Sequence, residues 1–195
     1  AAFAYREEIR DKMRLQLQIP QDAFVIGHVG RFGHMKNHTF LLDVFEQVNK
    51  KLPSSMLLLV GEGGLQDMIK EKAAALGLVD KVIFTGNQAD VSDYYQAMDF
   101  FVFPSVFEGL PGTVIEAQAS GLRCLVSDSV TPEVLITELA QAEPLSLGAG
   151  AWAANVLERK EYVRNQMTQA IKAAGFDVSD QVKMLEKIYL QENCQ

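Results

Sequence analysis

The sequence predicts an α/β domain: a Rossmann-like, doubly wound parallel sheet with helices on both faces and a helical C-terminal tail. Three observations support this fold class. Short apolar segments alternate five times with longer segments of helical periodicity. No hairpin-type turn joins two of the apolar segments. The apolar segments are also continuous rather than alternating, which is typical of parallel strands covered on both faces.

The expected elements follow one another in a regular order. Ile9, Met13 and Leu17 recur at four-residue spacing and predict a first helix over 5–18. Asp90 is an expected N-cap, because its carboxylate can accept from the first free backbone N–H groups of a helix. Strands are expected over 24–30, 56–61, 81–86, 100–103 and 123–127. Further helices are expected over 37–50, 65–76, 91–97, 112–120, 148–158, 160–174 and 178–190.

Length and composition predict a single domain over 1–195, with a core at about 22–147 and C-terminal helices at about 148–191. The net charge of −7 and the absence of a basic block argue against a nucleic-acid partner. The sequence has no membrane-spanning apolar run and no signal-peptide pattern. Cys124 and Cys194 make neither a disulfide framework nor a metal set. A cytoplasmic protein is therefore expected. The chain begins at Ala1 rather than methionine, so we expect an excised piece of a longer protein.

A binding site is expected at the carboxyl edge of the sheet, where ligands of open parallel sheets bind. Four of the five predicted strands end there in glycine or proline: Gly30, Gly61, Gly86 and Pro104. After Pro104 the chain passes through a glycine-bearing loop into a helix. Such a strand–loop–helix arrangement favours anions, since free backbone N–H groups and the positive end of the helix dipole point the same way.

Four charged residues lie at this edge. Arg31 and Lys36 follow the first strand and could hold a diphosphate, although they could equally be two solvated surface cations. Glu108 in the loop and Glu116 in the next helix can face one pocket, while Glu116 could also simply favour the helix dipole. Neither a phosphate-binding Gly-x4-Gly-Lys-Ser/Thr nor a dinucleotide-binding Gly-x-Gly-x-x-Gly occurs.

Other reactive residue types point to structure rather than chemistry. His28 is expected to be buried and hydrogen-bonded within its strand. His34 and His38 are four residues apart but lack a third ligand, so no metal site is expected. Cys124 lies in a strand and is expected in the core. The last helix carries an apolar stripe that we expect to pack against this domain or a missing partner domain: Val182, Leu185, Ile188 and Tyr189.

Four motifs occur in one order and at one spacing: Val29-Gly-Arg-x4-Lys-Asn37, Leu59-Val-Gly-x-Gly63, Val82-Ile-Phe-Thr-Gly86 and Pro104-Ser-x-Phe-Glu-Gly-Leu-Pro-x4-Glu-Ala117. Together they resemble the C-terminal, donor-binding domain of retaining glycosyltransferases with the GT-B fold. More narrowly, the chain resembles family four (group 1), whose members build bacterial capsule and exopolysaccharide. The resemblance runs from about residue 5 to the end of the chain.

The resemblance implies a role for each site residue. Arg31 and Lys36 would hold the donor diphosphate and stabilise the leaving group without a metal. Glu116 would accept hydrogen bonds from the ribose hydroxyls, and Glu108 would lie beside the transferred sugar. The donor would be a nucleoside-diphosphate sugar, with UDP-sugars expected first and GDP- or ADP-sugars as alternatives, and no cofactor is implied. Sugar and phosphate would meet the turn at Gly109, Leu110, Gly112 and Thr113, and the base would meet the loop at Gly86, Asn87 and Val91.

The sequence departs from the family pattern at Gly64 and Arg123, where proline is usual, and at Gly112, where a larger apolar residue is usual. The family's N-terminal acceptor domain is absent from this chain. We therefore expect weak nucleotide binding and little catalysis from the chain alone. A saccharide or lipid-linked acceptor would bind through the missing domain. Peripheral association with the inner face of the membrane is a further expectation for the full-length protein.

Two alternatives remain open at this stage. The chain could be a non-catalytic module that binds nucleotide sugar or saccharide and completes its cleft with a partner chain. It could also be a hydrolysing or epimerising nucleotide-sugar enzyme of the same fold, although the Glu108-Gly-Leu-Pro…Glu116 pattern argues against that. The length of the parent gene distinguishes the first alternative from a glycosyltransferase.

Overall fold

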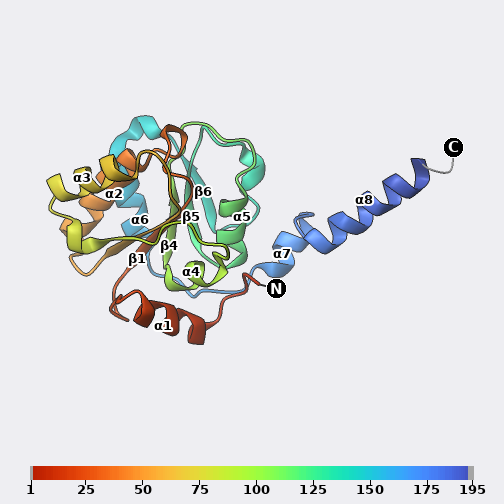
Figure 1. The fold of residues 1–195 in the computed structure, drawn as a ribbon, viewed down its shortest axis with the longest axis horizontal. Coiled ribbons are helices and arrows are strands. Elements are labelled where there is room, and N and C mark those ends of the chain that lie inside the picture. Colours follow the sequence, from red (N-terminus) through yellow and green to blue (C-terminus); the bar gives the residue numbers. More distant parts are fainter. Residues whose placement is uncertain (1, 193–195) are drawn as a thin grey trace.

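The computed structural model describes residues 2–192, and these form an α/β domain on a six-stranded sheet (Figure 1). The strands lie in the order β3-β2-β1-β4-β5-β6, and all neighbouring pairs are parallel. The expected Rossmann-like fold class is confirmed. The strands are β1 (Val25–Val29), β2 (Met56–Val60), β3 (Val82–Phe84), β4 (Phe100–Phe103), β5 (Arg123–Ser127) and β6 (Ala140–Glu143).

Helices cover both faces of the sheet (Figure 1). One face packs against α2, α3 and α6, and the other against α1, α4 and α5. The α-helices of the described residues are α1 (Glu7–Gln16), α2 (His38–Lys51), α3 (Gln66–Ala75), α4 (Ser92–Ala97), α5 (Gly112–Ala119), α6 (Gly148–Glu158), α7 (Thr168–Ala173) and α8 (Val178–Glu192). The 3₁₀ turns are η1 (His34–Lys36), η2 (Val79–Lys81), η3 (Pro132–Val134) and η4 (Leu145–Leu147).

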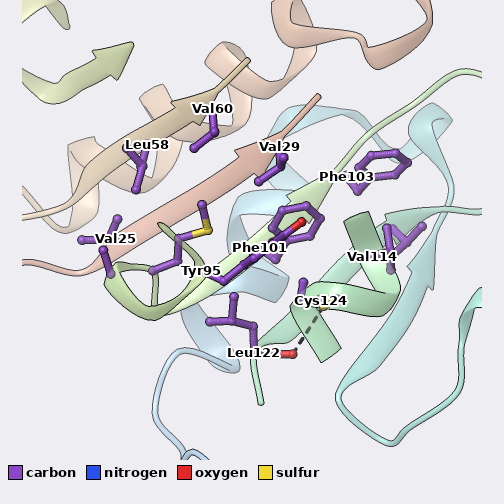
Figure 2. Close-up of a cluster of buried hydrophobic side chains, with 14 of the residues drawn as sticks. Val25, Val29, Leu58, Val60, Tyr95, Phe101, Phe103, Val114, Leu122 and Cys124 are labelled. Carbon is purple, nitrogen blue, oxygen red and sulfur yellow. Dashed lines mark hydrogen bonds between the residues drawn. The ribbon is translucent and has the colours of Figure 1, made fainter. Parts of the chain in front are cut away.

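The strands are apolar throughout because alternate side chains enter two different cores. In β4, Phe101 and Phe103 join the core beneath α4 and α5, which Figure 2 shows, while Phe100 and Val102 join the core beneath α2 and α6. Burying one such side chain stabilises the fold by roughly 1.5–3 kcal/mol. The second core also includes Trp152 of α6.

Two sequence-based expectations about the second half of the chain were wrong. The sheet has a sixth strand, β6, which pairs with β5 at the edge. Its sequence, Ala-Gln-Ala-Glu, has low β propensity, so pairing with β5 rather than local preference fixes it. Residues 160–167, expected as the first part of a helix over 160–174, are not helical, and α7 begins only at Thr168.

Tertiary hydrogen bonds explain the non-helical segment 160–167. The guanidinium of Arg164 donates to the backbone carbonyls of Tyr95, Met98 and Ser120 at 2.7–2.8 Å. The Tyr162 hydroxyl donates to the carbonyl of Asp99 at 3.0 Å. These bonds tie the segment to the chain around α4 and β4, and such long-range contacts outweigh helix propensity.

Helix α1 is anchored by a buried arginine. Arg14 has no exposed surface and donates to the carbonyls of Ala97 and Ala23 at 3.0 and 2.8 Å, and to Oδ2 of Asp99 at 2.7 Å. The same carboxylate oxygen accepts the N–H of Val25 at 2.7 Å. Asp99 therefore has a structural role, because it joins α1 to the start of β1. The expected N-cap role of Asp90 was wrong, because Val91 is the N-cap of α4 and the helix has no side-chain cap hydrogen bond. Oδ1 of Asp90 instead accepts the N–H of Ser92, the first residue of the helix, at 2.8 Å.

Helix α8 extends away from the body of the domain (Figure 1). Val182, Leu185 and Ile188 are exposed, so this apolar stripe does not pack against the sheet domain. Packing against a partner domain stays a prediction. None of the helices that the structure describes combines the length and apolar character that crossing a membrane requires. Cys194 lies outside the described residues, and Cys124 is fully buried as expected.

Candidate functional site

The loops after β1 and β4 meet at the point where the strand order reverses. β1 pairs with β4 in the sheet although β2 and β3 lie between them in sequence. The connections that leave β1 and β4 run to opposite faces of the sheet. The loops after these two strands therefore separate and leave room for a ligand between them. The loops are also hydrogen-bonded, because the N–H of Val106 donates to the carbonyl of Met35 at 2.9 Å.

Lys36 and Glu108 form an ion pair across these two loops. Nζ of Lys36 lies 2.8 Å from Oε1 of Glu108, and both side chains are largely buried. The same ammonium lies 4.6 Å from the centre of the Phe103 ring. A Cβ at Gly30 would lie 3.1 Å from Cε of Lys36, so glycine leaves the room in which the lysine stem crosses the end of β1.

A hollow of about 620 Å³ opens at the ends of β1 and β2, and neither Lys36 nor Glu108 is among its lining residues. Its lining includes Arg31, which is exposed, and Asn87 from the loop after β3. Glu62 and Gln66 also line it. The structure thus brings together Arg31 and Asn87, two of the residues predicted from sequence, and adds two polar side chains that were not predicted.

Two glycines hold the β2 loop against the β1 loop. A Cβ at Gly61 would lie 2.3 Å from the carbonyl oxygen of Gly30, and one at Gly63 would lie 2.5 Å from that of Phe32. Their φ angles are +132° and +158°. Any other residue here would clash with backbone, so the glycines shape one wall of the hollow.

Glu116 lies on α5, outside the lining of the hollow. Its Oε2 accepts a hydrogen bond of 2.9 Å from the hydroxyl of Tyr95. Burial raises the pKa of Glu116, and the hydrogen bond from Tyr95 opposes that rise. Asp90 raises it further through like charge. A half-buried carboxylate that has one oxygen hydrogen-bonded to a buried hydroxyl can present its other oxygen to a hydroxyl-bearing ligand.

The turn over 109–113 leads into α5, which begins at Gly112 with Pro111 as its N-cap. A Cβ at Gly109 or Gly112 would meet no atom within 4 Å, and Leu110 is exposed. Gly112, which stands where the family pattern usually has a larger apolar residue, therefore leaves open space in front of α5. Thr113 has a buried hydroxyl with no hydrogen-bond partner among residues 2–192.

The loop after β3 serves two purposes. The carbonyl of Gly86 accepts the N–H of Gly61 at 2.9 Å, which joins this loop to the wall of the hollow. Val91, the other end of the predicted base-binding loop, packs against the core beneath α4 instead of lining the hollow. Only Asn87 of this loop reaches the hollow.

Two buried histidines lie behind Lys36. Nδ1 of His28 donates to the carbonyl of Val102 at 2.9 Å, but Nε2 has no partner among residues 2–192, so His28 is only half hydrogen-bonded. Its ring centre lies 4.7 Å from that of His38, which stacks on Phe32. Burial lowers the pKa of both imidazoles, that of His38 to about 4, and the positive charge of Lys36 adds to the effect. Within the described part of the chain no three His, Cys, Asp or Glu residues are grouped as a metal site.

Sequence reasoning missed Glu62, Gln66 and Tyr95. The first two could have been found, because Gly61-x-Gly63 ends a predicted strand at the same sheet edge as Arg31. Tyr95 could not, since its contact with Glu116 joins two helices of unknown relative placement.

Comparison with known proteins connects this site to a family. A model of the family described as glycosyl transferases group 1 matches residues 9–172. This chain belongs to the glycosyl transferases group 1 family. The match covers the β1, β2, β3 and β4 loops, and with them every site residue described above.

Several relatives of this group 1 domain come from bacterial glycan synthesis. It is 34% identical over 96% of its length to the putative glycosyltransferase EpsF of Bacillus subtilis, and covers 50% of that protein. It is 29% identical over 88% of its length to the capsular polysaccharide biosynthesis glycosyltransferase CapH of Staphylococcus aureus, and covers 48% of it. The chain thus spans about half the length of these two relatives.

A solved structure shares the fold. The crystal structure of Anabaena HepE in complex with UDP matches 97% of this chain and 54% of HepE, with a TM-score of 0.79 and 23% identity. The group 1 domain therefore has the architecture of one half of a GT-B fold.

Proposed function

We propose that this domain binds the donor in a retaining glycosyltransferase, which moves a hexose-type sugar from a nucleoside-diphosphate sugar to a saccharide or lipid-linked acceptor. The proposed pathway is the synthesis of bacterial surface polysaccharide, which the likeness to CapH supports. One observation carries the proposal: the ion pair of Lys36 with Glu108 joins the loops after β1 and β4 at the switch point of the sheet, and Arg31 of the same β1 loop lines the hollow at the ends of β1 and β2.

The two cations are suited to a diphosphate. Arg31 lines the hollow with an exposed guanidinium, which can bind two phosphate oxygens at once. Lys36 lies across Gly30 and supplies a point charge whose position is fixed by Phe103 and Glu108. When the bond between sugar and phosphate breaks, these cations stabilise the negative charge that develops on the leaving diphosphate. We propose that they do so without a metal ion.

The remaining contacts follow from the placement of the other residues. Glu116 accepts hydrogen bonds from the ribose hydroxyls, and Glu108 lies by the transferred sugar. The backbone of the 109–113 turn meets the sugar hydroxyls and the phosphate, and the base lies against the loop at Asn87. UDP-sugars are the proposed donors, a choice that the UDP complex of the similar HepE fold supports. The acceptor attacks from the face that the diphosphate leaves, so the anomeric configuration is retained.

The domain is proposed to need a second half. The matched relatives are about twice as long as this chain, and the proposed acceptor site belongs to the part that this chain does not cover. We infer that the chain alone binds nucleotide weakly and transfers little or no sugar. A cytoplasmic enzyme, associated peripherally with the inner face of the membrane, suits a lipid-linked acceptor.

Isothermal titration calorimetry of the 195-residue chain with UDP, GDP and ADP tests the proposal. Arg31→Ala and Glu116→Ala are each expected to weaken binding of the preferred nucleotide about tenfold or more, because each removes a charge-assisted hydrogen bond. Lys50→Ala removes an exposed cation from α2 and serves as the matched control, with unchanged affinity expected. Unchanged affinity in both site variants contradicts the site assignment, and rapid sugar transfer by the isolated chain contradicts the need for a second half.

A further inference from the structure

Tyr95 is a buried residue with a specific partner at the site. It lies on α4 with no exposed surface, and its ring packs near Phe101 (Figure 2). It also packs edge-on against the ring of Phe3. Its hydroxyl lies 2.9 Å from Oε2 of Glu116 and 3.1 Å from the carbonyl oxygen of Thr113. Both acceptors belong to the first turns of α5, so one phenol joins α4 to α5.

The hydroxyl of Tyr95 can donate only one proton, and the chemistry of its neighbours decides where it goes. An ionised carboxylate is a stronger acceptor than a backbone carbonyl. The hydroxyl therefore donates to Glu116. Among the described residues, only Oε2 of the Glu116 carboxylate has a hydrogen-bond partner. One oxygen is held from the protein interior, and Oε1 stays available.

We propose that Tyr95 is a positioning residue that fixes the Glu116 carboxylate for recognition of a vicinal diol, the 2′- and 3′-hydroxyls of the donor ribose. This inference rests on the proposed function, in which Glu116 contacts the ribose. A carboxylate that must find its orientation on binding loses side-chain entropy, and a carboxylate already held by a buried donor loses less. Tyr95 thereby sets how strongly the site distinguishes ribose from a sugar without these hydroxyls.

The electrostatics of the carboxylate agree with this role. Burial and the like charge of Asp90 both raise the pKa of Glu116, and the hydrogen bond from Tyr95 lowers it. Tyr95 therefore helps to keep Glu116 in the ionised form, which accepts at both oxygens. Burial raises the pKa of the Tyr95 phenol well above its usual value, so the hydroxyl remains a donor throughout the physiological range.

The test compares two ligands on the 195-residue chain by calorimetry: UDP and 2′,3′-dideoxyuridine diphosphate. The natural chain is expected to prefer UDP about tenfold or more, since the preference reports hydrogen bonds to a charged acceptor. In Tyr95→Phe this preference is expected to fall several-fold, with little change in affinity for the dideoxy ligand. Tyr94→Phe, which removes the hydroxyl of the neighbouring half-buried tyrosine, is the matched control and is expected to keep the full preference.

The ratio of the affinities for UDP and the dideoxy ligand distinguishes a role of Tyr95 in positioning Glu116 from a role in packing alone. If Tyr95→Phe weakens both ligands equally, or keeps the full preference for UDP, the inference is overturned while the donor site stands. If the natural chain shows no preference for UDP, the proposed ribose contact of Glu116 fails and the inference fails with it. Tyr95→Met, a second side chain without a donor, must lose the preference in the same way. In a Glu116→Ala background, Tyr95→Phe must have no further effect on the preference.

Discussion

Nζ of Lys36 and Oε1 of Glu108 lie 2.8 Å apart, so the two charged groups at the β1–β4 switch point neutralise each other. The pair joins a loop that would hold phosphate to a loop that would hold sugar. A free diphosphate approaching Lys36 therefore meets the repulsion of Glu108 as well as the attraction of the lysine. Two unit charges about 4 Å apart interact by about 1 kcal/mol in water and more at a half-buried site.

We predict that Glu108→Gln strengthens binding of UDP about threefold to tenfold, because it removes this repulsion while keeping the shape of the side chain. Calorimetry at low and at physiological ionic strength measures the effect, which should shrink with added salt. Glu46→Gln is the matched control, since Glu46 forms an ion pair of the same 2.8 Å length with Lys50. Weaker UDP binding in Glu108→Gln would show that the carboxylate positions Lys36 more than it opposes phosphate.

Gly63 and Gly64 allow a test of the close approach between the β1 and β2 loops. The two residues are adjacent in sequence, but only Gly63 lies against the backbone of the other loop. A Cβ at Gly63 would lie 2.5 Å from the carbonyl oxygen of Phe32, whereas one at Gly64 would meet nothing within 4 Å. We predict that Gly63→Ala lowers the free energy of unfolding by about 1–3 kcal/mol, through backbone strain, and weakens UDP binding. Gly64→Ala is expected to stay within about 0.5 kcal/mol of the natural chain in urea unfolding. Equal stability of the two variants would show that the β1 and β2 loops do not need this close approach.

The buried histidines predict a loss of stability in acid. The pKa of His38 is about 4 in the folded chain and near 6.5 when unfolded. Between these values the unfolded chain binds a proton that the folded chain does not. The free energy of unfolding therefore falls as the pH drops from about 7 to about 4, by about 3 kcal/mol for His38. The pKa of His28 is lowered in the same direction, so its loss adds to this one.

Urea unfolding at a series of pH values checks this dependence. His38→Phe keeps a ring against Phe32 but cannot be protonated, so its stability is expected to fall less between pH 7 and pH 4. His34→Phe replaces an exposed histidine and should keep the natural pH dependence. Parallel curves for the natural chain and His38→Phe would contradict the prediction.

The same substitution, arginine to alanine, is expected to lower the free energy of unfolding by very different amounts at Arg14 and Arg10 of α1. Both face Asp99, with shortest separations of 2.7 Å for Arg14 and 3.9 Å for Arg10. Arg14→Ala removes the guanidinium that donates to the Asp99 carboxylate and to several backbone carbonyls, and is expected to lower the free energy of unfolding by about 3–5 kcal/mol. Arg10 is partly exposed, so Arg10→Ala should cost less than about 1 kcal/mol. Thermal or urea unfolding of both variants gives the comparison, and equal losses would show that Arg14 is not the anchor of α1.

Local patterns in the sequence determined the fold class and the edge of the sheet that carries the site. Continuous apolar runs such as Phe100–Phe103 indicate strands buried on both faces, and the alternation with helices then favours a parallel sheet. The carboxyl ends of parallel strands share one edge, so the strand assignments are enough to place Arg31, Lys36 and Glu108 in loops at that edge. The same reasoning could have included Glu62.

Tertiary structure alone decided the features that depend on contacts between distant residues. The strand β6 and the non-helical segment 160–167 have no local signal, because strand pairing and the hydrogen bonds of Arg164 and Tyr162 fix them. The ion pair of Lys36 with Glu108 and the bond from Tyr95 to Glu116 also depend on how two loops and two helices approach each other. Sequence periodicity reports which face of an element is buried, but it does not report which side chain of another element lies opposite.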